Sequence, residues 1–130
     1  PNSLENIVIG RSDLASSMGI EDVNSKYILE ITSEIISKCR RNNIKVTIGG
    51  NLTKDSYLFI KNFDSNELKA FESRKCTFSN SKKLSKKLFN QLIQAGLDFE
   101  LTWLNFKKSM YEDRSKEENI RISNIINRIK

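Results

Sequence analysis

The chain contains no histidine and only one proline among its 130 residues. Without histidine, a Ser-His-Asp triad and a Cys-His dyad are both excluded. The two cysteines, Cys39 and Cys76, are not closely spaced, so they do not form the paired ligands typical of a zinc site. We expect two free thiols, as in a reducing cytosol, rather than a disulfide. The remaining chemistry belongs to carboxylates, cations, hydroxyl groups and the backbone.

Long apolar runs are also absent. The longest are short strings such as Ile7-Val8-Ile9, whereas a helix that crosses a bilayer needs about 20 apolar residues. The sequence does not begin with methionine and shows no basic and apolar segment of a secretory signal. We therefore expect a cytoplasmic protein with no membrane partner, and a processing boundary at Pro1. The length suits one domain over residues 1–130.

Positive charge exceeds negative charge, with a formal net charge of +6. The densest basic run, Lys82-Lys83 and Lys86-Lys87, falls on the polar side of a predicted amphipathic helix. Acidic residues are interspersed elsewhere, and no RNA-binding motif or interleaved aromatic residues accompany the lysines. These features favour a solvated helix face, so we do not expect a nucleic-acid partner.

Strands and helices alternate through the first three quarters of the chain. Short β-branched runs indicate strands that are buried on both faces, and apolar residues at helical spacing indicate the helices between them. One such stripe is Ile28, Ile31, Ile35 and Cys39. Three strand-then-helix units in succession predict an α/β fold with three parallel strands. The predicted elements are strand Asn6–Gly10, a helix capped by Asn24 or Ser25 and ending at Arg41, strand Lys45–Ile48, a short helix from Thr53 to Asn62, strand Leu68–Ser73, the connection Arg74–Ser79 and helix Ser81–Ala95.

The last third of the sequence predicts helices without strands. Gly96 is a suitable end for the preceding helix. Asp98 can cap a second helix that reaches Tyr111, and Ser115 with Glu118 forms a capping-box pattern for a third. We therefore expect a C-terminal extension of two helices over residues 97–130, which docks on the sheet, on another subunit or on protein outside this chain.

Three segments follow the predicted strands and would meet at one edge of a parallel sheet, where ligands bind in such folds. They are Gly10-Arg11-Ser12-Asp13, Gly49-Gly50-Asn51 and Glu72-Ser73-Arg74. From the residues alone, Asp13 is either a turn or capping residue or a cation ligand. Gly49-Gly50 is either a sharp turn or an anion cradle. Glu72 and Arg74 on one side of a strand can simply pair with each other or with residues of neighbouring strands.

The string from Ile7 to Gly19, an apolar strand followed by Gly-x-x-Asp-Leu and a short turn to glycine, resembles the sixth strand of the HpcH/HpaI aldolase and citrate lyase beta-subunit family. Lys45–Gly50 resembles the seventh strand and Phe71–Lys75 the eighth, in an aldolase-like branch. The helical tail is also similar, through Leu101, Trp103, Leu104 and Tyr111. The resemblance covers nearly the whole chain.

This resemblance implies the C-terminal half of a phosphoenolpyruvate/pyruvate-type (β/α)₈ barrel. Such enzymes make or break carbon–carbon bonds beside a 2-oxo acid or an acyl thioester with Mg²⁺ or another divalent cation, which polarises the carbonyl group. The metal ligand falls on Asp13. The substrate carboxylate would be held by the backbone of Gly10, Arg11, Ser12 and Asp13.

The chain departs from the family pattern in two ways. Arg11 stands where many relatives have proline and adds a cation. The glutamate that completes the metal site, and the catalytic arginine and histidine, belong to earlier strands that this sequence does not contain. Three strands cannot close an eight-stranded barrel. We therefore expect association with the missing N-terminal half and a homo-oligomer.

Three functional hypotheses follow. The first is a fragment of a metal-dependent carbon–carbon lyase that is inactive alone. The second is a non-enzymatic half-barrel module that acts through self-assembly or partner binding. The third and weakest is a basic nucleic-acid-binding domain.

Overall fold

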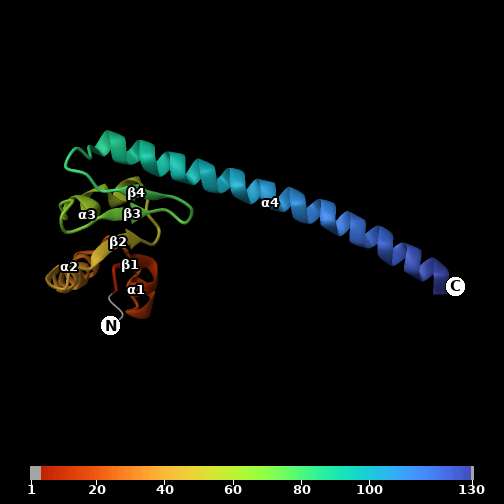
Figure 1. Ribbon diagram of the computed structural model, residues 1–130, viewed down its shortest axis with the longest axis horizontal. Coiled ribbons are helices and arrows are strands. Elements are labelled where there is room, and N and C mark those ends of the chain that lie inside the picture. The colour runs from red at the N-terminus through yellow and green to blue at the C-terminus, as the bar shows by residue number, and fades with distance from the viewer. Residues whose placement is uncertain (1–3, 130) are drawn as a thin grey trace. The chain divides into compact units, whose positions relative to one another are not determined.

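The computed structural model describes residues 4–129 and shows an α/β fold with one four-stranded mixed sheet (Figure 1). The strands are ordered β1-β2-β3-β4, so each pairs with its neighbour in sequence. β1 is parallel to β2 and β2 to β3, whereas β4 is antiparallel to β3. Their bounds are β1 Asn6–Gly10, β2 Lys45–Gly49, β3 Ala70–Glu72 and β4 Thr77–Ser79.

The antiparallel strand β4 corrects the expectation of a purely parallel sheet, since residues 74–79 were expected to be a connection. The chain reverses at Ser73, whose amide donates to the Cys76 carbonyl at 2.9 Å. Phe71 and Phe78 are then register partners, with ring centroids 5.6 Å apart. A strand of three residues is too short to show a period of two in the sequence, so only this pairing reveals it.

Within residues 4–129, five helical segments accompany the sheet. Ser25 caps α2 by accepting a hydrogen bond from the Ile28 amide at 3.4 Å, as predicted. Thr53 forms a capping box with Ser56 at the next helical segment, also close to the prediction. The helix that follows β1 directly was not predicted. The segments are α1 Arg11–Ser17, α2 Lys26–Arg41, the 3₁₀ turn η1 Lys54–Ser56, α3 Tyr57–Lys61 and α4 Lys86–Ile129.

α4 is one helix of 44 residues, so the expectation of a helix ending near Ala95 and two further helices was wrong. Gly96 is buried inside this helix rather than at its end. A Cβ there would lie 2.9 Å from Ser73 Oγ and 3.3 Å from the Phe78 ring. The glycine therefore allows the helix to approach the β3–β4 hairpin closely, and Asp98 and Ser115 lie within the helix instead of capping new ones.

By its internal contacts the chain divides into two units, residues 1–97 and 98–130. The first contains the sheet and the core, while the second is helical. Figure 1 shows the four strands side by side, from β1 near α1 to β4 near the first turns of α4. Within residues 4–129, no helix combines the length and the apolar content that a membrane crossing requires.

The core of the first unit is aromatic and aliphatic. Phe89 of α4 contacts Phe71 of β3 and Tyr57 of α3, with centroid distances of 5.2 and 5.6 Å. The buried stripe of α2 differs slightly from the predicted one, because Thr32 and Ile36 are buried where Ile31 and Ile35 were expected. Ile28 and Cys39 are buried as predicted, and both cysteines are free thiols.

The hydroxyl group of Thr32 lies in this core without a hydrogen-bond partner among the described residues. The residue is 0% exposed. Thr32→Val keeps the shape and removes a desolvated polar group, so we expect the free energy of unfolding to rise by about 1 kcal/mol. Urea denaturation of both proteins measures this, and a less stable valine variant would contradict the described packing.

Candidate functional site

The neighbouring strands β1 and β2 both end in a glycine, and the two glycines lie next to each other. Gly10 and Gly49 are register partners in the parallel pair. Residues paired in this way direct their Cβ positions to the same face of a sheet, and neighbouring strands lie about 4.8 Å apart. The missing side chains leave adjacent spaces on that face, each open to a side chain from elsewhere.

The carboxylate of Asp13 occupies the space beside Gly10. A Cβ on that glycine would lie 3.0 Å from Asp13 Oδ2 and 3.7 Å from its Cγ. Asp13 is in the first turn of α1, and it is exposed. The turn therefore folds the carboxylate back over the end of β1.

The carboxylate of Glu72 occupies the corresponding space beside Gly49. A Cβ on that glycine would lie 3.1 Å from Glu72 Oε1 and 3.0 Å from its Cγ. Glu72 ends β3 and follows Phe71, the register partner of Ile48. Its side chain therefore lies on the same sheet face as the two glycines.

Asp13 and Glu72 thus each place a carboxylate beside one of the two register-paired glycines at the carboxyl edge of the sheet. Neither has a hydrogen-bond or ion-pair partner among residues 4–129. The sequence singled out Asp13 as a ligand but interpreted Glu72 as the ion-pair partner of Arg74. The signal that could have identified Glu72 was the glycine that ends each of the two preceding strands.

Arg11 joins the loops that follow β1 and β2. The residue is buried, with 0% exposed. Its Nη2 donates to the Gly50 carbonyl at 2.9 Å and to Ser56 Oγ at 3.2 Å. Its Nη1 donates to Asn24 Oδ1 at 2.6 Å, and the guanidinium carbon lies 4.7 Å from the centroid of the Phe59 ring. One side chain therefore connects three loops at this edge.

Burial lowers the pKa of Arg11 from its ordinary value to about 10, while the negative charge of Asp22 acts in the opposite direction. The group is charged at neutral pH. Its donors are engaged by oxygen atoms of the protein itself, so the side chain is part of the fold. In the predicted substrate cradle, Arg11 can act only through its backbone.

Gly50 lies against the first turn of α1. A Cβ at this residue would be 2.6 Å from the amide nitrogens of both Arg11 and Ser12, and 3.1 Å from Ser12 Oγ. Its φ of +83° confirms the sharp turn that Gly49-Gly50 predicted. The two glycine-containing loops are therefore in contact.

The donor set partly fits a hard divalent cation. Carboxylate oxygens are the ligands that Mg²⁺ prefers, and Mg²⁺ is commonly held by one or two carboxylates together with water and substrate oxygens. The described residues contain no cluster of three or more Asp, Glu, Cys or His side chains that could hold a metal. Asp13 and Glu72 can thus supply two ligands of an incomplete site.

The amino end of the sheet has a different character. A hollow of about 210 Å³ is lined there by Arg40, Lys45, Glu67 and Lys69, among others. Arg40 and Glu67 approach to 3.9 Å across it. Its basic residues are partly neutralised by this pair, and the two carboxylates of the candidate site lie at the opposite end of the strands.

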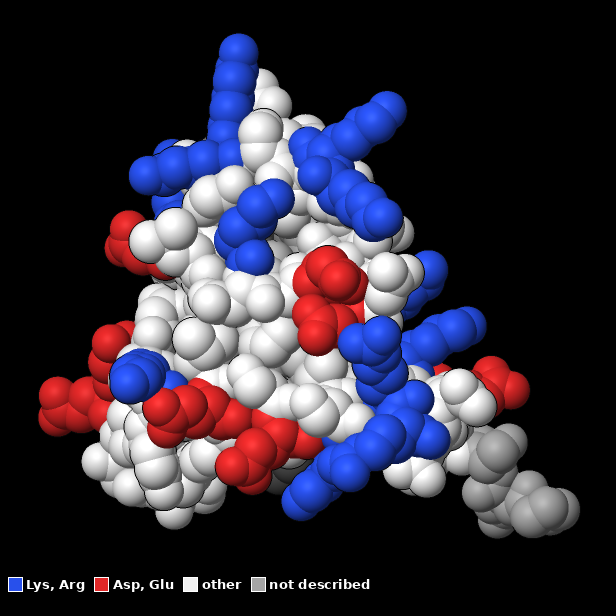
Figure 2. Space-filling model, turned by 90° about the vertical axis from the view of Figure 1, so that its left-hand side faces the viewer, with Lys and Arg blue, Asp and Glu red and all other residues white. Residues whose placement is uncertain are grey.

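Charged side chains are mixed on the face drawn in Figure 2. Basic side chains project at the top of this face, and acidic and basic ones alternate below. Lys82, Lys83, Lys86 and Lys87 are all exposed, as expected for a solvated surface. Mixed charge of this kind does not form the continuous basic surface that tracks a phosphate backbone.

No family model, no curated protein and no solved structure matches the chain at a significant level.

Proposed function

We propose that this chain is the C-terminal portion of a divalent-metal-dependent carbon–carbon lyase of the aldolase or citrate-lyase type, inactive by itself. Its substrate would be a 2-oxo acid or an acyl thioester, and the missing N-terminal half of a (β/α)₈ barrel would be its partner. The observation that carries the proposal is the pair of carboxylates, Asp13 and Glu72, packed over the register-paired glycines that end β1 and β2.

The arrangement of the sheet supports this assignment. Alternation along the strands places Thr47 and Ala70 on the same face as the two carboxylates, and Phe71 on the opposite face, where it contacts Phe89 of α4. Small residues along one face are compatible with the narrow interior of a barrel. Val8, on the same face of the edge strand β1, is 53% exposed, which leaves apolar surface for the missing half to cover.

Asp13 and Glu72 would hold Mg²⁺ or a similar cation, and the cation would supply Lewis-acid polarisation of the substrate carbonyl. The other groups have separate roles. The first turn of α1, with Ser12 and Asp13, would orient a substrate carboxylate beside the cation. Arg11 and Gly50 fix the loops that carry these groups.

Mn²⁺ titration tests the first part of the proposal without requiring activity. We expect the protein to bind Mn²⁺, measured by loss of the free-ion electron paramagnetic resonance signal. Asp13→Asn and Glu72→Gln should each weaken this binding about tenfold or more, because each removes one of two charged ligands.

Glu34→Gln is the matched control, because Glu34 is an exposed carboxylate on α2, away from the carboxyl edge of the sheet. We expect it to bind Mn²⁺ like the unmodified chain. Equal affinities for all four proteins would show that the cation binds elsewhere and would refute the proposed site.

The second hypothesis, a non-enzymatic half-barrel module, is favoured by a different observation. β1 forms an edge of the sheet with no strand paired on its outer side among the described residues. An unpaired edge can add a strand from another chain. Normal assembly together with the absence of Mn²⁺ binding would favour this hypothesis over the lyase.

A further inference from the structure

The described part of the second unit, residues 98–129, is a helix whose apolar residues are not covered. From residue 98 to 129 every residue is exposed except Glu100 and Lys107, which are partly buried. Several large apolar side chains on this helix retain half of their accessible surface or more. Leu101 is 60%, Leu104 50%, Tyr111 59%, Ile122 54% and Ile125 55% exposed. A helix with so much exposed apolar surface requires a partner.

These five residues belong to one stripe, which we call the α4 seam. Its positions alternate in steps of three and four residues, the heptad spacing of a coiled coil. Three polar residues occupy the middle of the stripe. The complete seam is Leu101, Leu104, Lys108, Tyr111, Ser115, Glu118, Ile122 and Ile125.

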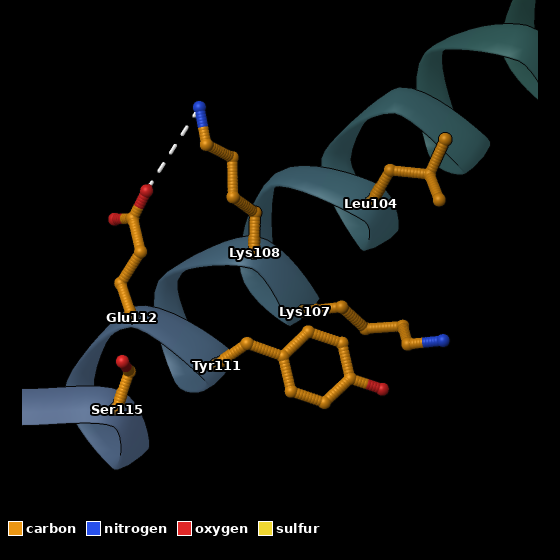
Figure 3. Close-up of a pocket in the computed structure, with 6 residues that line it drawn as sticks. All are labelled: Leu104, Lys107, Lys108, Tyr111, Glu112 and Ser115. Atoms are coloured by element: carbon orange, nitrogen blue, oxygen red, sulfur yellow. Dashed lines mark ion pairs between the residues drawn. The ribbon is translucent and has the colours of Figure 1, made fainter.

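Figure 3 shows the part of the seam where the apolar end meets the polar centre. Leu104, Lys108, Tyr111 and Ser115 follow one another along α4 and line a shallow hollow. Lys108 forms an exposed ion pair with Glu112 at 3.9 Å. An exposed pair of this kind contributes little, so it does not hold Lys108 away from a better partner.

The residues of the seam match those of a second copy when the two helices run in opposite directions. When two copies lie antiparallel, centred on Asp113, Leu101 faces Ile125 of the second copy and Leu104 faces Ile122. Tyr111 then faces Ser115, a large ring beside a small residue. The three pairings recur by symmetry on the other side of the centre.

The charged positions fit this alignment as well. Lys108 faces Glu118 of the second copy, and this layer also occurs twice. In a parallel alignment Lys108 would face Lys108 and Glu118 would face Glu118, so two layers of the seam would bury like charges. Polar residues inside a seam set orientation in this way, because the wrong pairing leaves a desolvated charge unpaired.

Charged residues that flank the seam weakly favour the parallel orientation. Lys107, Arg114 and Arg121 lie along one side, where antiparallel helices bring them near each other, while a parallel pair would place Lys107 near Glu112. Such flanking pairs are exposed and contribute about 0–1 kcal/mol each. Like charges buried within the seam are more unfavourable than like charges on its exposed flanks, so the seam residues determine the orientation. Moderate salt also reduces the repulsion between the flanking charges.

We propose that the α4 seam binds a second copy of this chain as an antiparallel coiled coil, with Lys108 of each copy paired with Glu118 of the other. This interface is independent of the proposed metal site. It makes the C-terminal helix a dimerisation element with a defined register and orientation.

Charge reversal tests the interface in the full 130-residue chain, by sedimentation equilibrium at about 0.3 M salt, where the Debye length is short. The unmodified chain should have twice the mass of the 15.0 kDa chain. Lys108→Glu and Glu118→Lys should each weaken association about tenfold or more, because each places like charges in two layers. The double variant should restore it.

Lys116→Glu is the matched control, because Lys116 is an exposed residue of the same helix outside the seam. It should leave association unchanged, and circular dichroism should show equal helix content for all variants. A monomeric unmodified chain would refute self-association. If the single charge reversals leave association unchanged, or if the double variant does not restore association, the antiparallel register is refuted.

Discussion

Replacing Arg11 with alanine should lower the free energy of unfolding by about 3–5 kcal/mol, the cost expected when a buried, hydrogen-bonded cation is removed. The guanidinium group is completely buried and donates to the Gly50 carbonyl, Asn24 Oδ1 and Ser56 Oγ. Truncation would remove one donor from each of these oxygen atoms and leave a cavity against Phe59. Domains of this kind have total stabilities of about 5–15 kcal/mol, so the variant is expected to be partly unfolded near 37 °C.

A lysine variant shows whether the several N–H donors of the guanidinium group, or its positive charge alone, stabilise the fold. Arg11→Lys keeps the charge but has a single ammonium group, whereas different nitrogens of the Arg11 guanidinium group contact the separate loops. We therefore expect the lysine variant to recover less than half of the free energy of unfolding lost in Arg11→Ala. Arg41→Ala is the control, since Arg41 is an exposed residue at the end of α2 and should change stability by about 0.5 kcal/mol or less. Urea denaturation gives all three values, and equal stability of the Arg11→Ala variant and the unmodified chain would contradict the described loop contacts.

Gly50→Ala should destabilise the chain by about 2–4 kcal/mol, because it combines backbone strain with a steric clash. The φ of Gly50 is +83°, and an added Cβ would lie 2.6 Å from two backbone nitrogens of α1. Backbone atoms cannot move aside as a flexible side chain can. The loop after β2 would have to separate from α1, and the site would lose its geometry.

Gly19→Ala separates the two contributions. Gly19 also has a positive φ, +67°, but an added Cβ there has no atom within 4 Å. This control should therefore show only the strain, about 1–2 kcal/mol. Thermal or urea denaturation of both variants measures the difference, and a Gly50→Ala variant no less stable than Gly19→Ala would contradict the close packing of the two loops.

Much of the fold could be predicted from local sequence signals. The strand ending at Gly10, the helix capped by Ser25 and the capping residue Thr53 are each encoded by a few neighbouring residues, and the structure confirms them. β4 could not be predicted, because its pairing with β3 depends on tertiary packing, and the passage of α4 through Gly96 could not be predicted either. In particular, Gly96 was expected to end a helix, but its small size serves the contact with Ser73 and Phe78.

The candidate site was predicted only in part. Asp13 was identified from a short motif, whereas Glu72 became relevant only when the register placed Gly10 beside Gly49. Arg11 was assigned to the substrate cradle, yet its side chain holds three loops together. A sequence pattern gives the order of such residues along the chain, but only the sheet register shows which side chains share a face.

An anomalous difference map from crystals of the 130-residue chain soaked in Mn²⁺ would test the central proposal most directly. The proposed site predicts a peak at the carboxyl edge of β1 and β2, within about 2.0–2.3 Å of carboxylate oxygens of both Asp13 and Glu72. A well-occupied Mn²⁺ ion elsewhere on the chain, with neither carboxylate coordinated, would contradict it.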